Sequence, residues 1–317
     1  MLTARVVVST CFAMTIALSA SFASAQAYPE KPIRIVCSGS SQELIARLIA
    51  QGITTPLGQP VIVENRPSVN ISSETVAKAK ADGYTMLLAG GSFHLAPLTQ
   101  KTPYDPVKDF TALTVVGRAP LVLYMAPSLP VKSVTELIAY AKARPGELNS
   151  SNGGIGGGSH LALEQLNLLA GIKIVPVPYT SGSQEMTDLM GGRVQITFAP
   201  PSPLMEQVKA GKLRALAVTS TAPSALAPDL PTIASTVPGY ERTNMTTMSM
   251  PAGTSRQIVE RLNREIVRVL TSAEIKERLL AAGIEADGTS PEQAAAMLAA
   301  DTAKLSKLIK ALGLELK

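Results

Sequence analysis

The chain has 317 residues, of which 46% are hydrophobic and 17% charged, and its formal net charge at pH 7 is +5. This composition predicts a globular protein with room for two domains, and it excludes a disordered chain, which would combine low hydropathy with high charge. The charges are scattered without a basic run and only 4% of the residues are aromatic, so we expect no nucleic-acid partner.

Residues 1–25 have the pattern of a secretory signal peptide. Arg5 supplies the positive start, an apolar core follows, and an Ala-Ser-Ala cleavage site ends at Ala25. We therefore expect cleavage after Ala25, a mature chain that begins at Gln26, and export to the periplasm. After this segment the sequence has no run that approaches the ~20 apolar residues of a membrane-spanning helix.

The mature chain alternates β-branched strand patterns with helical patterns, as an α/β protein does. In its first half the sequence predicts strands at 33–37, 60–65, 84–91 and 121–127. It predicts helices in the same half at 42–53, 72–81 and 133–146. The last of these helices is opened by Ser133 and Glu136 as a capping box.

A second series of elements follows a glycine-rich run at 149–159. Its predicted strands are 172–179, 194–200 and 213–220, and its predicted helices are 160–171, 184–192 and 203–211. The C-terminal part is predicted to be helical, with capping boxes at Thr254 with Gln257, Thr271 with Glu274 and Ser290 with Gln293.

The same strand–loop–helix unit appears in both halves of the chain. Two such units predict an α/β clamshell of two lobes, with two extended crossings between them. We expect lobe I to comprise 26–125 and 248–317, and lobe II to comprise 126–247. The crossings are then expected near 124–126 and 247–250.

Five predicted strand ends carry small or polar residues. Ligands of open α/β sheets bind beyond the carboxyl ends of strands, and the N–H groups of helix N-termini attract anions there. Glycine and serine also simply make turns, which explains any one of these loops by itself; five together favour a shared cleft. The candidate binding residues are Ser38, Gly39, Ser40, Ser41, Gly91, Ser92, Gly154, Gly156, Gly157, Gly158, Ser159, Thr180, Ser181, Gly182, Ser183 and Ala199.

The glycine-rich run suggests a specific geometry for this cleft. We expect the loop Gly154–Ser159 to bind one ligand carboxylate through its backbone N–H groups, with Ser159 as the N-cap of the following helix. The loop Ser38–Ser41 and the turn Thr180–Ser183 are expected to complete the cleft.

The sequence offers no set of residues for catalysis. The glycine run matches neither the phosphate-loop nor the dinucleotide-binding pattern, and no nucleophile-elbow motif is present. The two histidines, His94 and His160, have no metal-ligand partners at suitable spacing. His160 falls in the first turn of a helix, where we expect a neutral hydrogen-bonding or packing residue and not a general base. We therefore predict no enzyme activity, no metal and no cofactor.

A series of collinear motifs covers almost the whole mature chain: YPEKPIRIV, LGQPVIVENRP, DGYTMLLAG, PYDPVKDF, SHLALEQL, PVPYTSGSQEMTDLMGGRV and AGKLRALAVTS. These motifs resemble the Bug (TctC) family of periplasmic solute receptors of tripartite tricarboxylate transporters. The resemblance implies a type II periplasmic-binding-protein fold that closes on a small carboxylate and delivers it to membrane transporter components, and we expect a monomer. A ligand-loaded adaptor for a sensor-kinase ectodomain is the alternative function.

The departures from the family pattern gather at the implied pocket. The family's first-lobe glycine turn is shortened at Ser38–Glu43, and Gly157 replaces a threonine of the second-lobe loop. The turn at 179–181 lacks the family's lysine, and Ala199 replaces an aspartate that is common there. These changes fit an altered ligand preference or a loss of binding. Because Ala199 removes a carboxylate that could bind a ligand amine, they favour a plain carboxylic acid over an amino acid.

Overall fold

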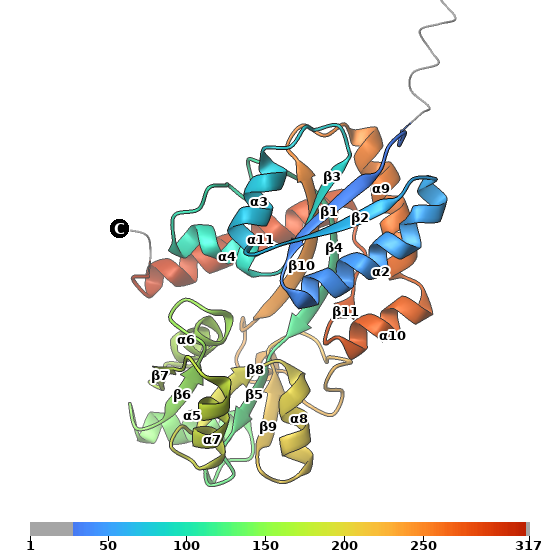
Figure 1. Ribbon diagram of the computed structural model, residues 1–317. Coiled ribbons are helices and arrows are strands. Elements are labelled where there is room, and N and C mark those ends of the chain that lie inside the picture. Colours follow the sequence, from blue (N-terminus) through green and yellow to red (C-terminus); the bar gives the residue numbers. More distant parts are fainter. Residues whose placement is uncertain (1–27, 315–317) are drawn as a thin grey trace, which may run out of the picture.

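The computed structural model describes residues 28–314 and contains two β-sheets with helices on both faces of each. Figure 1 shows these as two lobes, with β4 and β10 running side by side from the first lobe toward the second. The predicted signal peptide, residues 1–25, lies outside the described residues. Within 28–314 no helix is both long and apolar enough to cross a membrane.

The first lobe is built on a six-stranded mixed sheet. Its strands are β1 (Ile33–Ser38), β2 (Val61–Arg66), β3 (Thr85–Ala89), β4 (Phe110–Pro120), β10 (Thr243–Pro251) and β11 (Glu285–Ala286), in the order β11-β4-β10-β3-β1-β2. Strand β1 is parallel to β2 and β3, whereas β10 is antiparallel to β3 and β4. The carboxyl ends of β1 and β3 therefore lie at one edge of the sheet.

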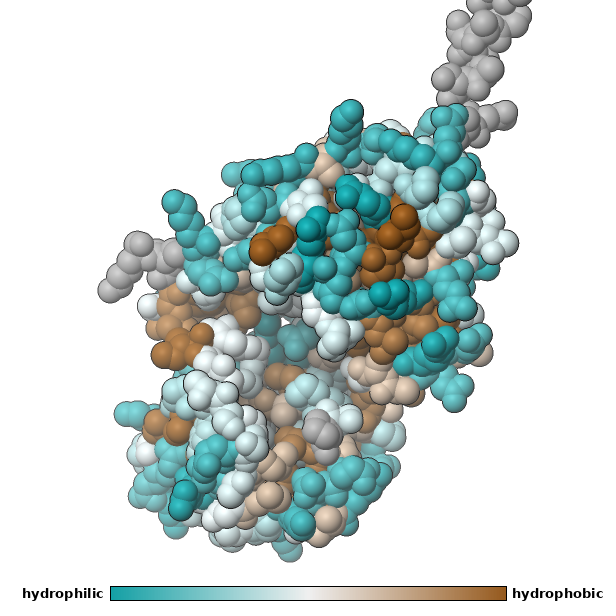
Figure 2. All heavy atoms as spheres, in the orientation of Figure 1, coloured by the Kyte–Doolittle hydropathy of each residue, from teal (hydrophilic) through white to brown (hydrophobic). Residues whose placement is uncertain are grey.

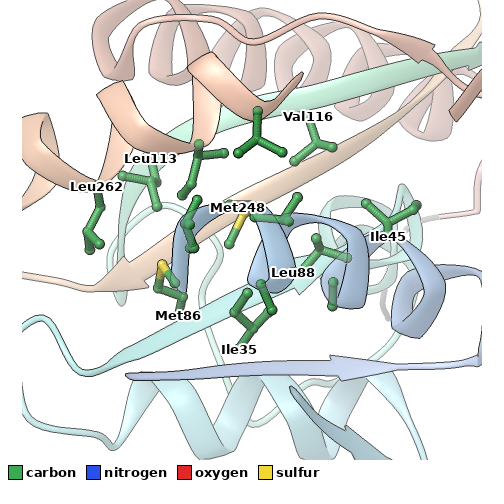
Figure 3. Packing of buried hydrophobic residues seen from close by; sticks show 14 of the residues in the cluster. Ile35, Ile45, Met86, Leu88, Leu113, Val116, Met248 and Leu262 are labelled. Carbon is green, nitrogen blue, oxygen red and sulfur yellow. The ribbon is translucent and has the colours of Figure 1, made fainter. Parts of the chain in front are cut away.

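Two apolar layers cover this sheet. The helices α2 (Ser40–Leu57), α9 (Arg256–Leu270) and α10 (Ala273–Ala281) pack on one face, and α3 (Val69–Ala77), α4 (Ser92–Thr99) and α11 (Pro291–Ala311) on the other. Figure 3 shows the first layer, where Ile35, Met86 and Met248 of the sheet meet Ile45 and Leu262 of the helices.

The second lobe is built on a five-stranded sheet. Its strands are β5 (Val122–Met125), β6 (Asn149–Asn152), β7 (Val175–Pro178), β8 (Ile196–Ala199) and β9 (Arg214–Val218), in the order β7-β6-β8-β5-β9. Its helices are α5 (Val134–Ala143) and α6 (Gly158–Ala170) on one face, and α7 (Gly182–Met190) and α8 (Pro201–Lys209) on the other. Strands β7 and β8 are both parallel to β6, so the three carboxyl ends share an edge.

The chain changes sheets earlier than the sequence predicted. Strand β5 pairs with β8 and β9 in the second sheet, although the range 26–125 had placed it in lobe I. Strand β10 pairs with β4 from Thr243 onward, although the range 126–247 had placed its first half in lobe II. The long strand β4 was not predicted, which explains the first shift. The division into lobes stays a prediction, with its boundaries moved to Leu121 and to the residues just before Thr243.

One buried residue connects the two crossings. Thr219, directly after β9, is fully buried. Its Oγ1 accepts a hydrogen bond of 2.7 Å from the N–H of Leu121 at the first crossing. Its carbonyl oxygen accepts one of 2.8 Å from the N–H of Arg242 at the second crossing. The two connections between the sheets are thus held against the same residue.

The predicted helix caps are right at one of three C-terminal positions. Ser290 and Gln293 form the predicted capping box of α11. The cap of α9 is Ser255 instead of Thr254, whose hydroxyl donates to the carbonyl of Pro251. The cap of α10 is Ser272 instead of the neighbouring threonine.

Candidate functional site

The carboxyl ends of the second sheet lead into the loops that the sequence singled out. The glycine run follows β6, the turn at 180–183 follows β7, and Ala199 is the last residue of β8. The N–H of Tyr179 donates to the carbonyl of Asn152 across 2.8 Å, which ties the ends of β7 and β6 together. The parallel pairing of β6 with its neighbours therefore brings three of the five predicted loops to one edge.

The glycine loop uses most of its own N–H groups internally. Gly154 donates to Oδ1 of Asn152 at 3.0 Å, and Gly157 to the carbonyl of Gly154 at 3.2 Å. Gly156 donates to Nδ1 of His160, also at 3.2 Å. The loop is therefore folded onto itself and onto its helix before any ligand binds.

Three amides of this segment stay available. Among residues 28–314, the N–H groups of Ile155, Gly158 and Ser159 form no hydrogen bond with a protein acceptor. Two of them belong to the first turn of α6, where backbone N–H groups carry partial positive charge. The anion-binding capacity of the loop thus lies in the first turn of the helix more than in the glycines before it.

The predicted helix cap of this segment is wrong. The N-cap of α6 is Gly157, with φ −71° and ψ 167° and no side-chain cap. Ser159 is the second residue of the helix, and its Oγ accepts a long hydrogen bond of 3.4 Å from the N–H of Gly153. The helix therefore starts two residues earlier than expected.

His160 is the anchor of the glycine loop. Its side chain is buried, and burial holds the pKa of the imidazole below its usual value, against the opposing effect of Glu164. Because Nδ1 accepts the Gly156 amide, the proton of the neutral ring lies on Nε2, 3.8 Å from Oε1 of Glu164. The predicted role of His160 as a neutral hydrogen-bonding residue is confirmed by this geometry.

The first-lobe loop is held by an asparagine that the sequence did not single out. Gly39 is the N-cap of α2 with φ 87° and ψ 154°, a conformation that favours glycine. Its N–H donates to Oδ1 of Asn65 at 3.1 Å, and Nδ2 of Asn65 donates to Oε2 of Glu43 at 2.6 Å. Hydrogen bonds from Arg47 and Asn65 lower the pKa of the Glu43 carboxyl. Ser40 and Ser41 form the exposed first turn of α2.

The loops of the two lobes meet at Asn244 of β10. A β-carbon added at Gly91, at the start of α4, would lie 3.2 Å from Oδ1 of Asn244. A β-carbon added at Gly158, at the start of α6, would lie 3.6 Å from the same oxygen. Gly156 similarly approaches Thr99 of α4. The structure therefore brings Gly91 and Gly158 together at Asn244, while Gly156 lies against the last residue of α4. Figure 2 shows the molecule hollowed between the lobes.

The turn before α7 contributes serine hydroxyls and a carboxylate. Ser181 caps α7 by accepting from the N–H of Gln184, and its Oγ lies 2.9 Å from Oγ of Ser183. Behind this turn, Oε1 of Glu185 accepts hydrogen bonds from Ser151 at 2.8 Å and Thr197 at 3.1 Å. Glu185 is not among the residues predicted from the sequence.

The predicted residues do not all come into contact. Among the described residues, no hydrogen bond joins the loop Ser38–Ser41 to the turn Thr180–Ser183. Within 28–314 there is also no group of three or more side chains placed to hold a metal ion. The contacts thus bring together the starts of α4 and α6, at Asn244.

Comparison with known proteins shows which family and which relatives this chain is similar to. Residues 45–314 match the model of the tripartite tricarboxylate transporter family receptors. The protein BugT of Bordetella pertussis is 33% identical over 303 residues, which cover 93% of each chain.

Two solved structures carry ligands in their names. One is an R. palustris protein with adipate, 34% identical, covering 90% of this chain and 98% of its own, with a TM-score of 0.70. The other is MatC from Rhodopseudomonas palustris with bound malate, 25% identical, covering 89% and 100%, with a TM-score of 0.67.

Proposed function

Because the chain belongs to the TctC family of tripartite tricarboxylate transporter receptors, we propose that it is a periplasmic receptor for a small carboxylate. In this proposal it captures the ligand between its lobes and delivers it to the membrane components of a transporter. The leader expected at 1–25 supports export, and mass spectrometry of a periplasmic extract should find Gln26 at the N-terminus. A membrane-bound protein that retains its first 25 residues would contradict this location.

The meeting of α4 and α6 at Asn244 carries the proposal. The first turn of α6 offers the free amides of Gly158 and Ser159, and the start of α4 approaches the same asparagine oxygen. A carboxylate in this position would accept hydrogen bonds from donors of both lobes. Each charge-assisted hydrogen bond contributes roughly 1.5–3 kcal/mol, so a few of them approach the ~8 kcal/mol of a micromolar complex.

The relatives support the ligand class. One is solved with adipate and another with malate, both of which are small dicarboxylates. Lobe closure would remove the bound carboxylate from water, which strengthens its hydrogen bonds to the helix first turns. A transporter that recognises only the closed form would then accept loaded receptor in preference to empty receptor.

We assign no catalytic step to this protein. The two histidines that could serve as general bases have structural partners. His160 accepts the Gly156 amide, and His94 is buried against Thr247, with Nε2 at 3.4 Å from Oγ1. Neither is placed to take a proton from a ligand in the cleft.

A thermal-shift screen tests the proposed function. Mono-, di- and tricarboxylates, aromatic acids and acidic amino acids are added to the mature protein, and hits are measured by calorimetry. We expect at least one carboxylate to bind with micromolar affinity or better and to raise the melting temperature. If no member of the panel binds to folded protein, carboxylate capture is not its function.

A further inference from the structure

Glu185 places a negative charge at the edge of the second sheet. It lies in the first turn of α7, and its Oε1 accepts hydrogen bonds from the hydroxyls of Ser151 on β6 and Thr197 on β8. Those two residues are register partners in the sheet and are each 1% exposed. Two rigid donors on one oxygen fix the direction of the carboxylate.

This carboxylate has no cationic partner within the protein. Among the described residues, Glu185 takes part in no ion pair, whereas Asp188, one turn later, pairs with Arg193 at 3.2 Å. The carboxylate is half-buried, so it has given up part of its hydration without gaining a counter-charge. A cation that entered the cleft would restore this balance.

The small side chain of Ala199 leaves space next to Glu185, toward the carboxyl end of β8. Side chains alternate along a strand, so Thr197 and Ala199 of β8 point to the same face, with Ala199 nearer the cleft by one repeat of roughly 7 Å. Both the Glu185 oxygen and the methyl of Ala199 therefore lie on the α7 side of the sheet. No larger β8 side chain stands between the carboxylate and the end of the strand.

We propose that Glu185 makes this receptor selective for an amino-carboxylate, a ligand that has an ammonium group as well as a carboxylate. The carboxylate is bound at the first turn of α6, and the ammonium faces Oε2 of Glu185. This inference rests on the proposed carboxylate receptor function and names the ligand class of the same site. It is opposite to the preference for a plain acid that Ala199 alone suggested.

Matched ligand pairs test this selectivity. Calorimetry compares L-aspartate with succinate, L-glutamate with glutarate, and 4-aminobutanoate with butanoate; the members of each pair differ only in the ammonium group. In the unaltered protein we expect at least one amino-carboxylate to bind tenfold or more tightly than its partner. A plain acid that binds as tightly as its amino partner in every pair, or more tightly, would overturn the inference.

Two variants separate selectivity from folding. Glu185→Gln keeps the acceptor for Ser151 and Thr197 but removes the charge, so the amino preference should fall at least tenfold. Glu147→Gln removes a carboxylate that is 69% exposed, just before β6, and should leave the preference unchanged. Melting curves of both variants serve as the check that each one folds.

The outcomes also distinguish this inference from the function it rests on. If plain acids bind and Glu185→Gln does not change the ratio, the amino-carboxylate inference is wrong while the receptor function stands. If no carboxylate with or without an ammonium group binds to the folded protein, the receptor function itself is wrong and the inference falls with it.

Discussion

The N–H of Gly156 donates a hydrogen bond of 3.2 Å to Nδ1 of His160, four residues further along the chain. This bond closes the glycine loop onto the first turn of its own helix. It exists only while the imidazole is neutral, because a protonated ring has no acceptor nitrogen. The shape of the candidate carboxylate site is therefore coupled to the protonation of a buried histidine.

Removal of this acceptor should weaken ligand binding. His160→Leu fills a similar volume but leaves the Gly156 amide without its partner. Because a hydrogen bond contributes about 1 kcal/mol, we expect the affinity for the best carboxylate to fall about fivefold. His160→Asn, which still offers an acceptor oxygen, should recover part of the loss. Calorimetry at pH 7.5 measures both, and equal affinity of His160→Leu and the unaltered protein would contradict the anchoring role.

Two glycines of the loop should respond differently to valine. Gly156 has φ 78°, so Gly156→Val strains the backbone and should cost about 1–2 kcal/mol of folding free energy. Gly158 lacks a positive φ, and its added atoms would extend toward Asn244. Gly158→Val should therefore cost affinity, at least tenfold, with a smaller loss of stability. Urea unfolding and calorimetry of the two variants separate these effects; full affinity in folded Gly158→Val would exclude the first turn of α6 as the binding site.

The stability of the protein should fall on mild acidification because of His94. Burial lowers the pKa of this histidine to about 4, from a usual value of 6.5. The unfolded chain then binds a proton that the folded chain does not, so the free energy of unfolding decreases as the pH falls from 6.5 to about 4. The loss amounts to about 3 kcal/mol over that window. Urea unfolding at several pH values should show that the free energy of unfolding declines less steeply with acidification in His94→Gln. The same slope in the variant and in the unaltered protein would show that His94 is not the cause of the decline.

Thr219→Val tests the residue that joins the two crossings. Valine has nearly the shape of threonine but cannot accept from the Leu121 amide, which is left buried without its acceptor. We expect a loss of about 1–3 kcal/mol in the free energy of unfolding. Thr219→Ser keeps the hydroxyl and should lose less. Greater stability of the valine variant than of the serine variant would show that packing, not this hydrogen bond, holds the crossings.

The fold was predictable where strands are apolar. The strands 33–37 and 84–91 were found because their buried β-branched and aliphatic residues stand out from the flanking helices. Strand β6 was missed because its sequence is entirely polar, Asn-Ser-Ser-Asn, although Ser150 and Ser151 are each 1% exposed. Local composition cannot show that Ser151 is buried beside a carboxylate from α7.

The site was predictable only in part, for a related reason. The rule that ligands lie beyond strand ends selected the loops, and it needs no tertiary information. Asn244 is the second residue of β10, a strand that was itself missed, and Glu185 has the pattern of an ordinary helix-surface residue. Their roles depend on which elements lie opposite them in the fold. A sequence pattern does not contain this tertiary information.

The contacts of Thr219 have a mechanical consequence. Pro120 and Thr243 are register partners at the end of the β4–β10 pair, and Thr219 bonds to the residues on either side, Leu121 and Arg242. Because both connections are held at one point, we expect them to act as a single hinge if the cleft closes on a ligand. Loop residues far from Thr219 would then move furthest, and those next to it would move least.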